Sequence, residues 1–251
     1  MTLLSLSRVA KRFPSTQKMG GTQALHDLSF DIATGAFVSL LGPSGCGKST
    51  ALRLAAGLLE PDGGTIAYPQ GKPEIGFVFQ DATLMPWADA LTNARLPLDL
   101  KRMPRGQANR RAGEALARVG LEGFAHALPR ELSGGMKMRV SLARALCSFT
   151  APAQPKLLLL DEPFAALDEI TRNELGDDLL RLWREGEDLT ILFVTHSVGE
   201  SSYLSDRVLV MTPRPGRIAA DIALTQARPE RLSPATIEAQ RTISAALRVA
   251  A

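Results

Sequence analysis

The glycine-rich segment from Gly42 to Thr50 carries the residues of this chain that are best suited to chemistry. It matches the pattern G-x-x-x-x-G-K-[ST], in which backbone N–H groups curl inward around phosphate oxygens. In this pattern Lys48 reaches the β- and γ-phosphates, and the Ser49 hydroxyl ligates Mg²⁺. Every residue of the segment is therefore a candidate for nucleotide binding: Gly42, Pro43, Ser44, Gly45, Cys46, Gly47, Lys48, Ser49 and Thr50. The segment predicts a site for a nucleoside triphosphate.

The elements around this segment are those that a phosphate site requires. The apolar run over 37–41 predicts a buried strand that leads into it, and residues 51–58 show helical spacing after it. A helix N-terminus carries partial positive charge, which favours bound phosphate. A glycine-rich turn that binds nothing is the alternative, and the strand–loop–helix context argues against it.

A pair of acids forms the second candidate constellation. The apolar run over 157–160 ends directly in Asp161 and Glu162, which places both carboxylates at the carboxyl end of a strand. Asp161 is the candidate for holding Mg²⁺, through water, and Glu162 is the candidate for polarising the attacking water. The alternative is a solvated acidic pair that only closes a strand.

The remaining pattern predicts an α/β protein. Leu28, Phe30 and Ile32 alternate with polar residues, as in a strand with one buried face. The continuous apolar runs over 156–161 and 190–195 are typical of parallel strands covered on both faces. We expect one large domain over about residues 1–225. Its catalytic core comprises about 1–84 and 156–225, a helical insertion spans about 85–155, and 226–251 forms a helical tail.

Composition excludes several other classes of protein. The chain has 251 residues, 29 basic and 26 acidic side chains, and only 5% aromatic residues. The net charge is only +3, and few aromatic side chains are present to stack on bases. Both features argue against nucleic acid as a partner. The two cysteines do not suggest a disulfide framework, and no apolar stretch approaches the ~20 residues that span a bilayer.

Further motifs, in order along the chain, support a family resemblance. The segment Leu132-Ser133-Gly134-Gly135-Met136 resembles the signature motif of ATP-binding cassette (ABC) ATPases. Other residues are similar to the aromatic that stacks on adenine, the Q-loop glutamine, the D-loop aspartate and the switch histidine of that family: Phe13, Gln80, Asp168 and His196. The chain therefore resembles the ATP-hydrolysing subunit of an ABC transporter.

The resemblance implies a fold and a set of site residues. It implies a phosphate-loop (RecA-like) core with an N-terminal antiparallel β region and a helical subdomain. ATP and Mg²⁺ are the implied cofactors, with the metal near Ser49, Gln80 and Asp161. Lys48, Gln80, Glu162 and His196 are the implied catalytic residues. The signature residues Ser133, Gly134 and Gly135, together with Asp168, are implied to face ATP in a homodimer that holds two nucleotides between two copies.

The segments 85–87, 162–168 and 213–218 narrow the resemblance to bacterial importers of nitrate, sulfonates, taurine and related small solutes. The implied partners are two permease subunits and, indirectly, a periplasmic solute-binding protein, with the chain peripheral at the cytoplasmic face of the inner membrane. Two residues depart from the family pattern: Met138 replaces a usual glutamine, and Ser197 replaces a usual aspartate.

Two other functions are compatible with a phosphate loop. A soluble ABC ATPase that acts on nucleic acid or ribosomes would carry long coiled-coil insertions or two cassettes, and neither fits in 251 residues. A GTPase or small-molecule kinase would leave the signature motif unexplained, and the guanine-reading Asn-Lys-x-Asp is absent.

Overall fold

The computed structural model describes residues 1–14, 21–186, 188–224, 231 and 233–250. The chain forms two compact units, which are described separately. The first comprises Met1–Pro73 and Thr190–Ala251, and the second comprises Glu74–Leu189. The helical insertion expected over 85–155 falls inside the second unit, and the predicted boundaries of core, insertion and tail stay predictions.

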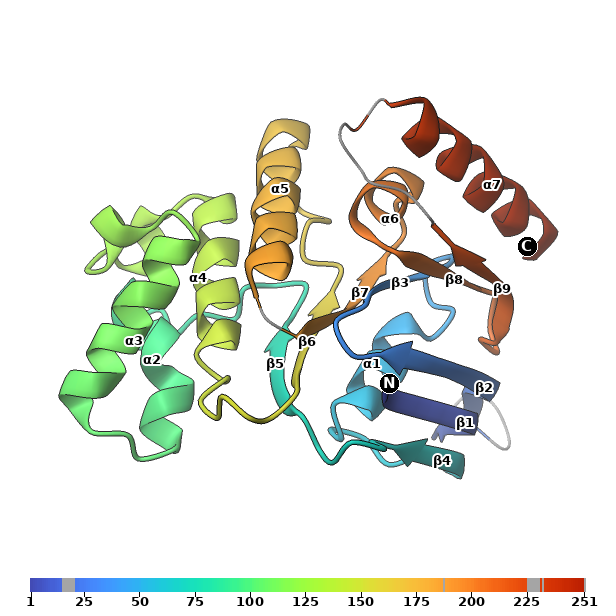
Figure 1. Cartoon of the computed structure of the whole chain (residues 1–251), viewed down its shortest axis with the longest axis horizontal. Coiled ribbons are helices and arrows are strands. Elements are labelled where there is room, and N and C mark those ends of the chain that lie inside the picture. Colours follow the sequence, from blue (N-terminus) through green and yellow to red (C-terminus); the bar gives the residue numbers. More distant parts are fainter. Residues whose placement is uncertain (15–20, 187, 225–230, 232, 251) are drawn as a thin grey trace. The chain divides into compact units, whose positions relative to one another are not determined.

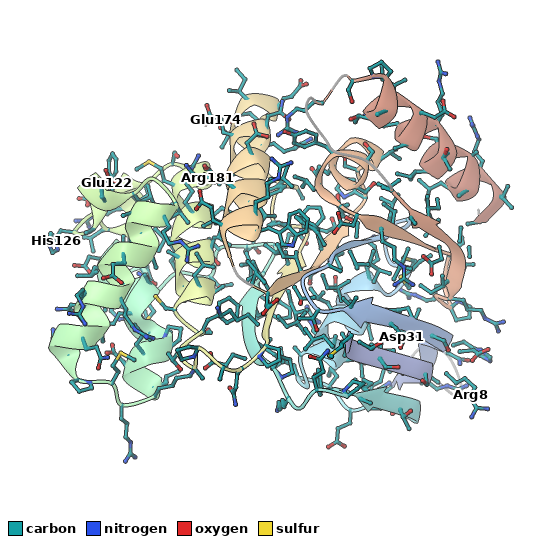
Figure 2. The ribbon with its side chains drawn as sticks, viewed as in Figure 1. Arg8, Asp31, Glu122, His126, Glu174 and Arg181 are labelled. Carbon is teal, nitrogen blue, oxygen red and sulfur yellow. The ribbon has the colours of Figure 1, made fainter. Side chains whose placement is uncertain are left out.

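An antiparallel sheet forms one layer of the first unit (Figure 1). Its strands are β1 (Thr2–Phe13), β2 (Thr22–Ala33) and β4 (Gly63–Ala67), in the order β2-β1-β4. The alternation predicted for β2 is confirmed, because Leu28, Phe30 and Ile32 are buried while the residues between them are exposed. Arg8 and Asp31 occupy exposed positions of this sheet (Figure 2).

A second group of strands positions the phosphate loop in the first unit. In the order β7-β3-β8-β9, these are β7 (Leu189–Thr195), β3 (Phe37–Leu41), β8 (Arg207–Met211) and β9 (Ile218–Ala223). The first three run parallel, and β9 pairs antiparallel with β8. Every residue of β3 and β7 is buried, as expected for parallel strands with both faces covered.

Three helices accompany these strands: α1 (Lys48–Ala55), α6 (Val198–Leu204) and α7 (Pro234–Ala250). The predicted tail helix is α7, and the Ser233 hydroxyl accepts a hydrogen bond from the Thr236 N–H at 3.2 Å to cap its start. Ile243 of α7 is fully buried against Leu41 and Val208. No helix among the described residues is long and apolar enough to cross a membrane.

The second unit is mainly helical and contains one parallel strand pair. The pair is β5 (Glu74–Val78) and β6 (Lys156–Asp161). Its helices are α2 (Ala90–Leu100), α3 (Arg105–Arg118), α4 (Gly134–Leu146) and α5 (Glu169–Glu185), with the short 3₁₀ turns η1 (Glu122–Phe124) and η2 (Pro129–Glu131). Helical spacing in the sequence over 107–119 and 137–147 predicts two helices of this insertion. They correspond to α3 and α4, which begin two and three residues earlier.

Candidate nucleotide-binding site

The phosphate loop lies between β3 and α1 of the first unit, as the sequence predicts. Gly47 has a φ of 108° and directly precedes the first residue of α1. A Cβ at this position would lie 2.7 Å from Leu25 Cδ2, so the tight turn into the helix requires glycine. Pro43, Ser44 and Gly45 are exposed, which leaves the middle of the loop accessible to a ligand.

Lys48 is held inside this loop. Its side chain is almost fully buried, and Nζ donates to the carbonyl oxygens of Gly42 at 2.8 Å and Pro43 at 3.1 Å. The ammonium therefore lies at the centre of the loop, where it can meet phosphate oxygens. Ser49 and Thr50 are half-buried in the first turn of α1.

Contacts from distant segments fix the outer side of the loop, and sequence reasoning missed them. Arg214 donates from Nε to the Gly45 carbonyl at 2.9 Å, and Gly216 donates to the Ala24 carbonyl at 2.9 Å. A Cβ on Gly216 would lie 2.2 Å from the carbonyl oxygen of Cys46, so the backbones approach closely here. The only available signal was the unusual Pro- and Gly-rich composition of residues 213–216.

His196 follows β7 and lies beside the start of the phosphate loop. Leu41 and Thr195 are partners in the parallel β3–β7 pair, so Gly42 and His196 leave the same edge of the sheet. Both residues line a pocket of about 250 Å³ together with Pro43. The structure thus brings the predicted histidine to the predicted loop within one unit.

The departure at Ser197 has a local explanation. Its hydroxyl accepts a hydrogen bond from the Glu200 N–H at 3.2 Å and caps the start of α6. Serine and aspartate are both favoured helix caps, so serine preserves the turn that follows His196. Met138 is buried in α4, where an apolar side chain fills the core.

Phe13 ends β1 with 36% of its side chain exposed. Lys11 Nζ lies 5.9 Å from the centre of its ring. The ring is thus partly accessible to solvent, and its contact with adenine stays a prediction.

In the second unit, Asp161 is the last residue of β6, and Gln80 lies two residues beyond the end of β5. Val78 pairs with Leu160, so both side chains follow the carboxyl ends of neighbouring parallel strands. Asp161 is 5% exposed and Gln80 is exposed. Glu162 has a φ of 47°, an uncommon value for a residue other than glycine. Such conformations concentrate at functional sites.

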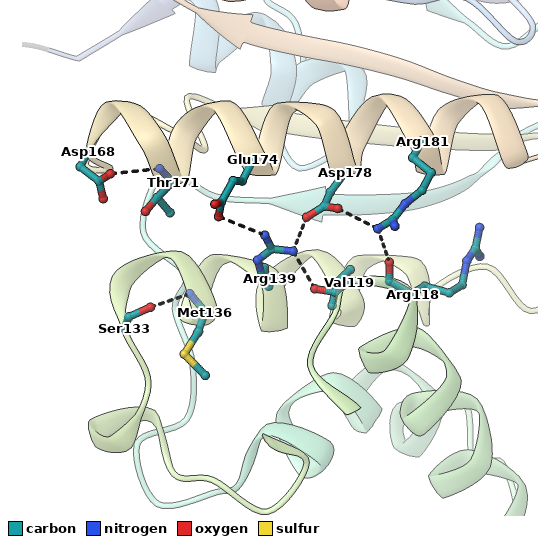
Figure 3. Close-up of polar contacts among 10 residues, drawn as sticks. All are labelled: Arg118, Val119, Ser133, Met136, Arg139, Asp168, Thr171, Glu174, Asp178 and Arg181. Atoms are coloured by element: carbon teal, nitrogen blue, oxygen red, sulfur yellow. Dashed lines mark hydrogen bonds and ion pairs between the residues drawn. The ribbon is translucent and has the colours of Figure 1, made fainter. Parts of the chain in front are cut away.

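The residues predicted as the signature motif form the start of α4, and the predicted D-loop aspartate directly precedes α5. Ser133 caps α4 by accepting from the Met136 N–H at 3.2 Å, and Asp168 caps α5 by accepting from the Thr171 N–H at 3.0 Å (Figure 3). The latter bond lowers the pKa of Asp168 below its ordinary value. Ser133, Gly134 and Asp168 are exposed, so both helix starts can meet a ligand or partner.

These features define an α/β nucleotide-binding cassette, with a phosphate loop and His196 in one unit and an acidic strand end and the helix capped by Ser133 in the other. Comparison with known proteins agrees. The ABC transporter family profile matches residues 25–165, more than half of the 251 residues. The chain belongs to the ABC transporter family.

Similar proteins and a solved structure extend this result. The chain is 48% identical over 202 residues to the aliphatic sulfonates import ATP-binding protein SsuB 2 of Pseudomonas syringae pv. tomato, covering 80% of this chain and 82% of the relative. It is 43% identical over 209 residues to the taurine import ATP-binding protein TauB of Yersinia pestis bv. Antiqua, covering 81% and 80%.

The ATP-binding cassette MJ0796, solved as a post-hydrolysis dimer bound to ADP and Pi, matches with a TM-score of 0.76 and 31% identity. That match covers 90% of this chain and all of the other. The fold class expected from the sequence is confirmed.

Proposed function

We propose that this chain is the ATP-hydrolysing subunit of a bacterial importer for a small solute of the sulfonate and taurine class. The observation that carries the proposal is the occurrence, in one chain, of a phosphate loop with a buried central lysine and a serine-capped signature helix. The import functions of the relatives SsuB 2 and TauB support import as the process that hydrolysis drives.

The first unit supplies the contacts to ATP. Residues 42–50 cradle the phosphates, with the Lys48 ammonium on the β- and γ-phosphates. Phe13 stacks on the adenine through its exposed ring. His196 lies beside the loop start, where it can donate a hydrogen bond to the γ-phosphate.

The second unit supplies the hydrolytic groups. The Glu162 carboxylate accepts a proton from the attacking water while the water oxygen bonds to the γ-phosphorus. The bond from that phosphorus to the β–γ bridging oxygen breaks, which releases ADP and phosphate. Gln80 and Asp161, the last residue of β6, offer amide and carboxylate oxygens, and Ser49 of the first unit offers a hydroxyl; these are donor types that Mg²⁺ prefers. When bound, Mg²⁺ neutralises charge that develops on the phosphates.

A second copy of the chain completes each site in this proposal. Ser133, Gly134 and Asp168 present exposed helix starts that can bind the γ-phosphate side of ATP held by the other copy, and the buried Gly135 contributes to the first turn of α4. The dimeric state of the MJ0796 cassette supports this arrangement. ATP then joins the two copies, and hydrolysis releases them.

Two permease subunits at the cytoplasmic face of the inner membrane, and indirectly a periplasmic solute-binding protein, complete the proposed transporter.

The rival function, a soluble ABC ATPase acting on nucleic acid or ribosomes, is not favoured by the import functions of the relatives. The net charge of +3 also offers little attraction to nucleic acid.

Mixing two inactive variants tests the shared site. Lys48→Ala removes a charged contact to phosphate, so ATP affinity falls. Ser133→Arg leaves ATP binding to its own phosphate loop intact but blocks the site of the partner. Each heterodimer contains one complete site, so ATPase activity returns in the mixture although both parents are inactive. Heterodimers that form and remain inactive would contradict the proposal.

The same mixture, co-expressed with the proposed permease subunits, tests the transport function. Uptake of labelled taurine or an alkanesulfonate should return with the ATPase activity. Restored ATPase without uptake of any solute of this class would refute the substrate class and leave the ATPase standing.

A further inference from the structure

The helices α4 and α5 lie side by side in the second unit, and each begins with a residue proposed to face ATP. Ser133 caps α4, and Asp168 caps α5 (Figure 3). The signature and D-loop segments therefore project from neighbouring helix starts. Their relative position depends on what joins the two helices.

Close packing joins the helices at their first turns. A Cβ on Gly135 would lie 2.4 Å from Cγ2 of Thr171, a distance that real Cβ atoms do not show. A Cβ on Gly134 would lie 3.7 Å from Leu167, which is ordinary contact. The second signature glycine thus allows α4 to approach α5 at this end.

Arg139 joins the helices one turn further along. It lies four residues after Gly135, on the same face of α4. Its guanidinium forms an ion pair with the Asp178 carboxylate of α5 and lies 4.0 Å from the carboxylate of Glu174 (Figure 3). It also donates to the Val119 carbonyl at 2.8 Å, at the end of α3.

This pair is shielded from water on both sides. The side chains of Arg139 and Asp178 are each 17% exposed, so the interaction is stronger than that of a surface pair. Asp178 also accepts from Arg181 at 2.7 Å, but Arg181 lies on α5 itself, with 52% of its side chain exposed. Of these two cations, only Arg139 connects α4 to α5.

We propose that Arg139 is a positioning residue for ATP hydrolysis. With the Gly135–Thr171 contact, its pair with Asp178 holds the signature serine and Asp168 at a fixed spacing, so that both reach the ATP of the second copy as one rigid piece. Arg139 touches no nucleotide in this arrangement. The inference rests on the proposed shared site.

The test compares the effect of Arg139→Ala on turnover with its effect on ATP binding. Displacing positioned groups by about 1 Å can cost ~10²-fold in rate, so we expect kcat to fall by about 10- to 100-fold. The dissociation constant of ATP for the monomer should stay within about twofold, because the phosphate loop is untouched. Arg139→Lys keeps the charge without the forked donors and should retain intermediate activity.

The matched control is Arg181→Ala. It removes the other cation from Asp178 and leaves the α4–α5 connection in place, so near-wild-type turnover is expected. Unchanged kcat in Arg139→Ala, or an equal loss in Arg181→Ala, overturns the proposal. Should Arg139→Ala fail to fold, the isosteric Asp178→Asn is judged by the same criteria.

Mixing variants separates positioning from general destabilisation. An Arg139→Ala chain damages only the site of its partner, so mixing it with Lys48→Ala should restore turnover at one site per heterodimer. A destabilised chain would not be rescued in this way. If ATPase activity returns in the mixture of Lys48→Ala with Ser133→Arg but not in the mixture of Lys48→Ala with Arg139→Ala, only the inference about Arg139 is refuted. Failure of both mixtures refutes the shared site.

Discussion

At the scale of single residues, Glu162 combines two features expected of the group that activates water. It directly follows the buried Asp161 at the end of β6, and its φ of 47° places it in the left-handed region. That conformation costs of order 1 kcal/mol for a residue with a side chain. The surrounding structure must impose this strained conformation. Strained conformations cluster at functional sites, which supports a functional role for the Glu162 carboxylate.

Replacing Glu162 by glutamine should separate binding from hydrolysis. Glutamine is nearly isosteric but cannot accept the proton of the attacking water, so turnover should fall by about 10² to 10⁴. ATP binding should persist, and an ATP-stabilised dimer should accumulate on gel filtration. Glu185→Gln, at the exposed end of α5, provides the control. Wild-type turnover in Glu162→Gln would exclude Glu162 as the base.

The local residues of the site were predictable from sequence, and the long-range ones were not. The phosphate loop and the signature segment are each defined by a contiguous pattern of residues. Arg214 contacts Gly45 across 169 positions, and Arg139 contacts Asp178 across 39. Nothing in the local sequence of either arginine indicates its partner, because the fold alone brings the two ends together.

At the scale of elements, Glu74 connects three segments of the second unit. Its carboxylate, at the start of β5, accepts from the N–H groups of Thr150 at 2.6 Å and Ala151 at 2.9 Å, beyond the end of α4. Lys101, after α2, donates to it at 2.7 Å. Burial alone would raise the pKa of Glu74, but these hydrogen bonds outweigh burial and lower it.

Replacing Glu74 by alanine should therefore destabilise the second unit. The side chain is only 9% exposed, and its loss leaves backbone donors without a charged acceptor, at a cost of about 2–3 kcal/mol. Both tryptophans, Trp87 and Trp183, lie in this unit, so urea unfolding followed by tryptophan fluorescence reports on it. Glu114→Ala, which removes an exposed carboxylate 4.0 Å from Arg110, should change the free energy of unfolding by less than about 0.5 kcal/mol.

The contribution of Glu74 to the free energy of unfolding should be larger at neutral pH than in acid. Because its folded pKa is lowered, its stabilising contribution is fully present above the ordinary glutamate value of ~4.3. The contribution is lost as pH falls from there through the folded pKa. The difference in unfolding free energy between wild type and Glu74→Gln should be full at pH 7 and smaller near pH 3. An equal difference at both pH values would contradict this role.

The elements themselves were largely predictable, because hydrophobic period is a local property. The buried runs of β3, β6 and β7 and the alternation in β2 follow directly from the sequence. Helix starts were placed too late in α3 and α4. α3 begins with Arg105 directly after Pro104, and α4 begins with two glycines, so apolar spacing does not mark their first turns.

At the scale of the whole molecule, the segment after Gln80 presents the surface best suited to a membrane partner. Trp87 is 79% exposed, although the backbone around it is fixed. The fully buried Asn93 accepts from the Met85 N–H at 2.7 Å and donates to the Ala88 carbonyl at 2.9 Å. Arg144 of α4 donates to the Thr83 carbonyl at 2.9 Å, so the signature helix also holds this segment. A rigid, exposed tryptophan is the type of side chain that dominates protein interfaces.

Trp87→Ala should uncouple transport from hydrolysis. The exposed ring contributes little to folding, so the ATPase activity and the unfolding free energy of the isolated chain should change little, by less than about 0.5 kcal/mol for the latter. Loss of an interface anchor costs about 2 kcal/mol or more, roughly 30-fold in affinity for the permease. Co-purification with the membrane subunits and solute uptake should fall together.

Leu100→Ala, 76% exposed at the end of α2, provides the control and should leave both unchanged. Normal assembly and uptake in Trp87→Ala would remove this residue from the docking surface, and parallel loss of folding and ATPase activity would contradict a role confined to docking.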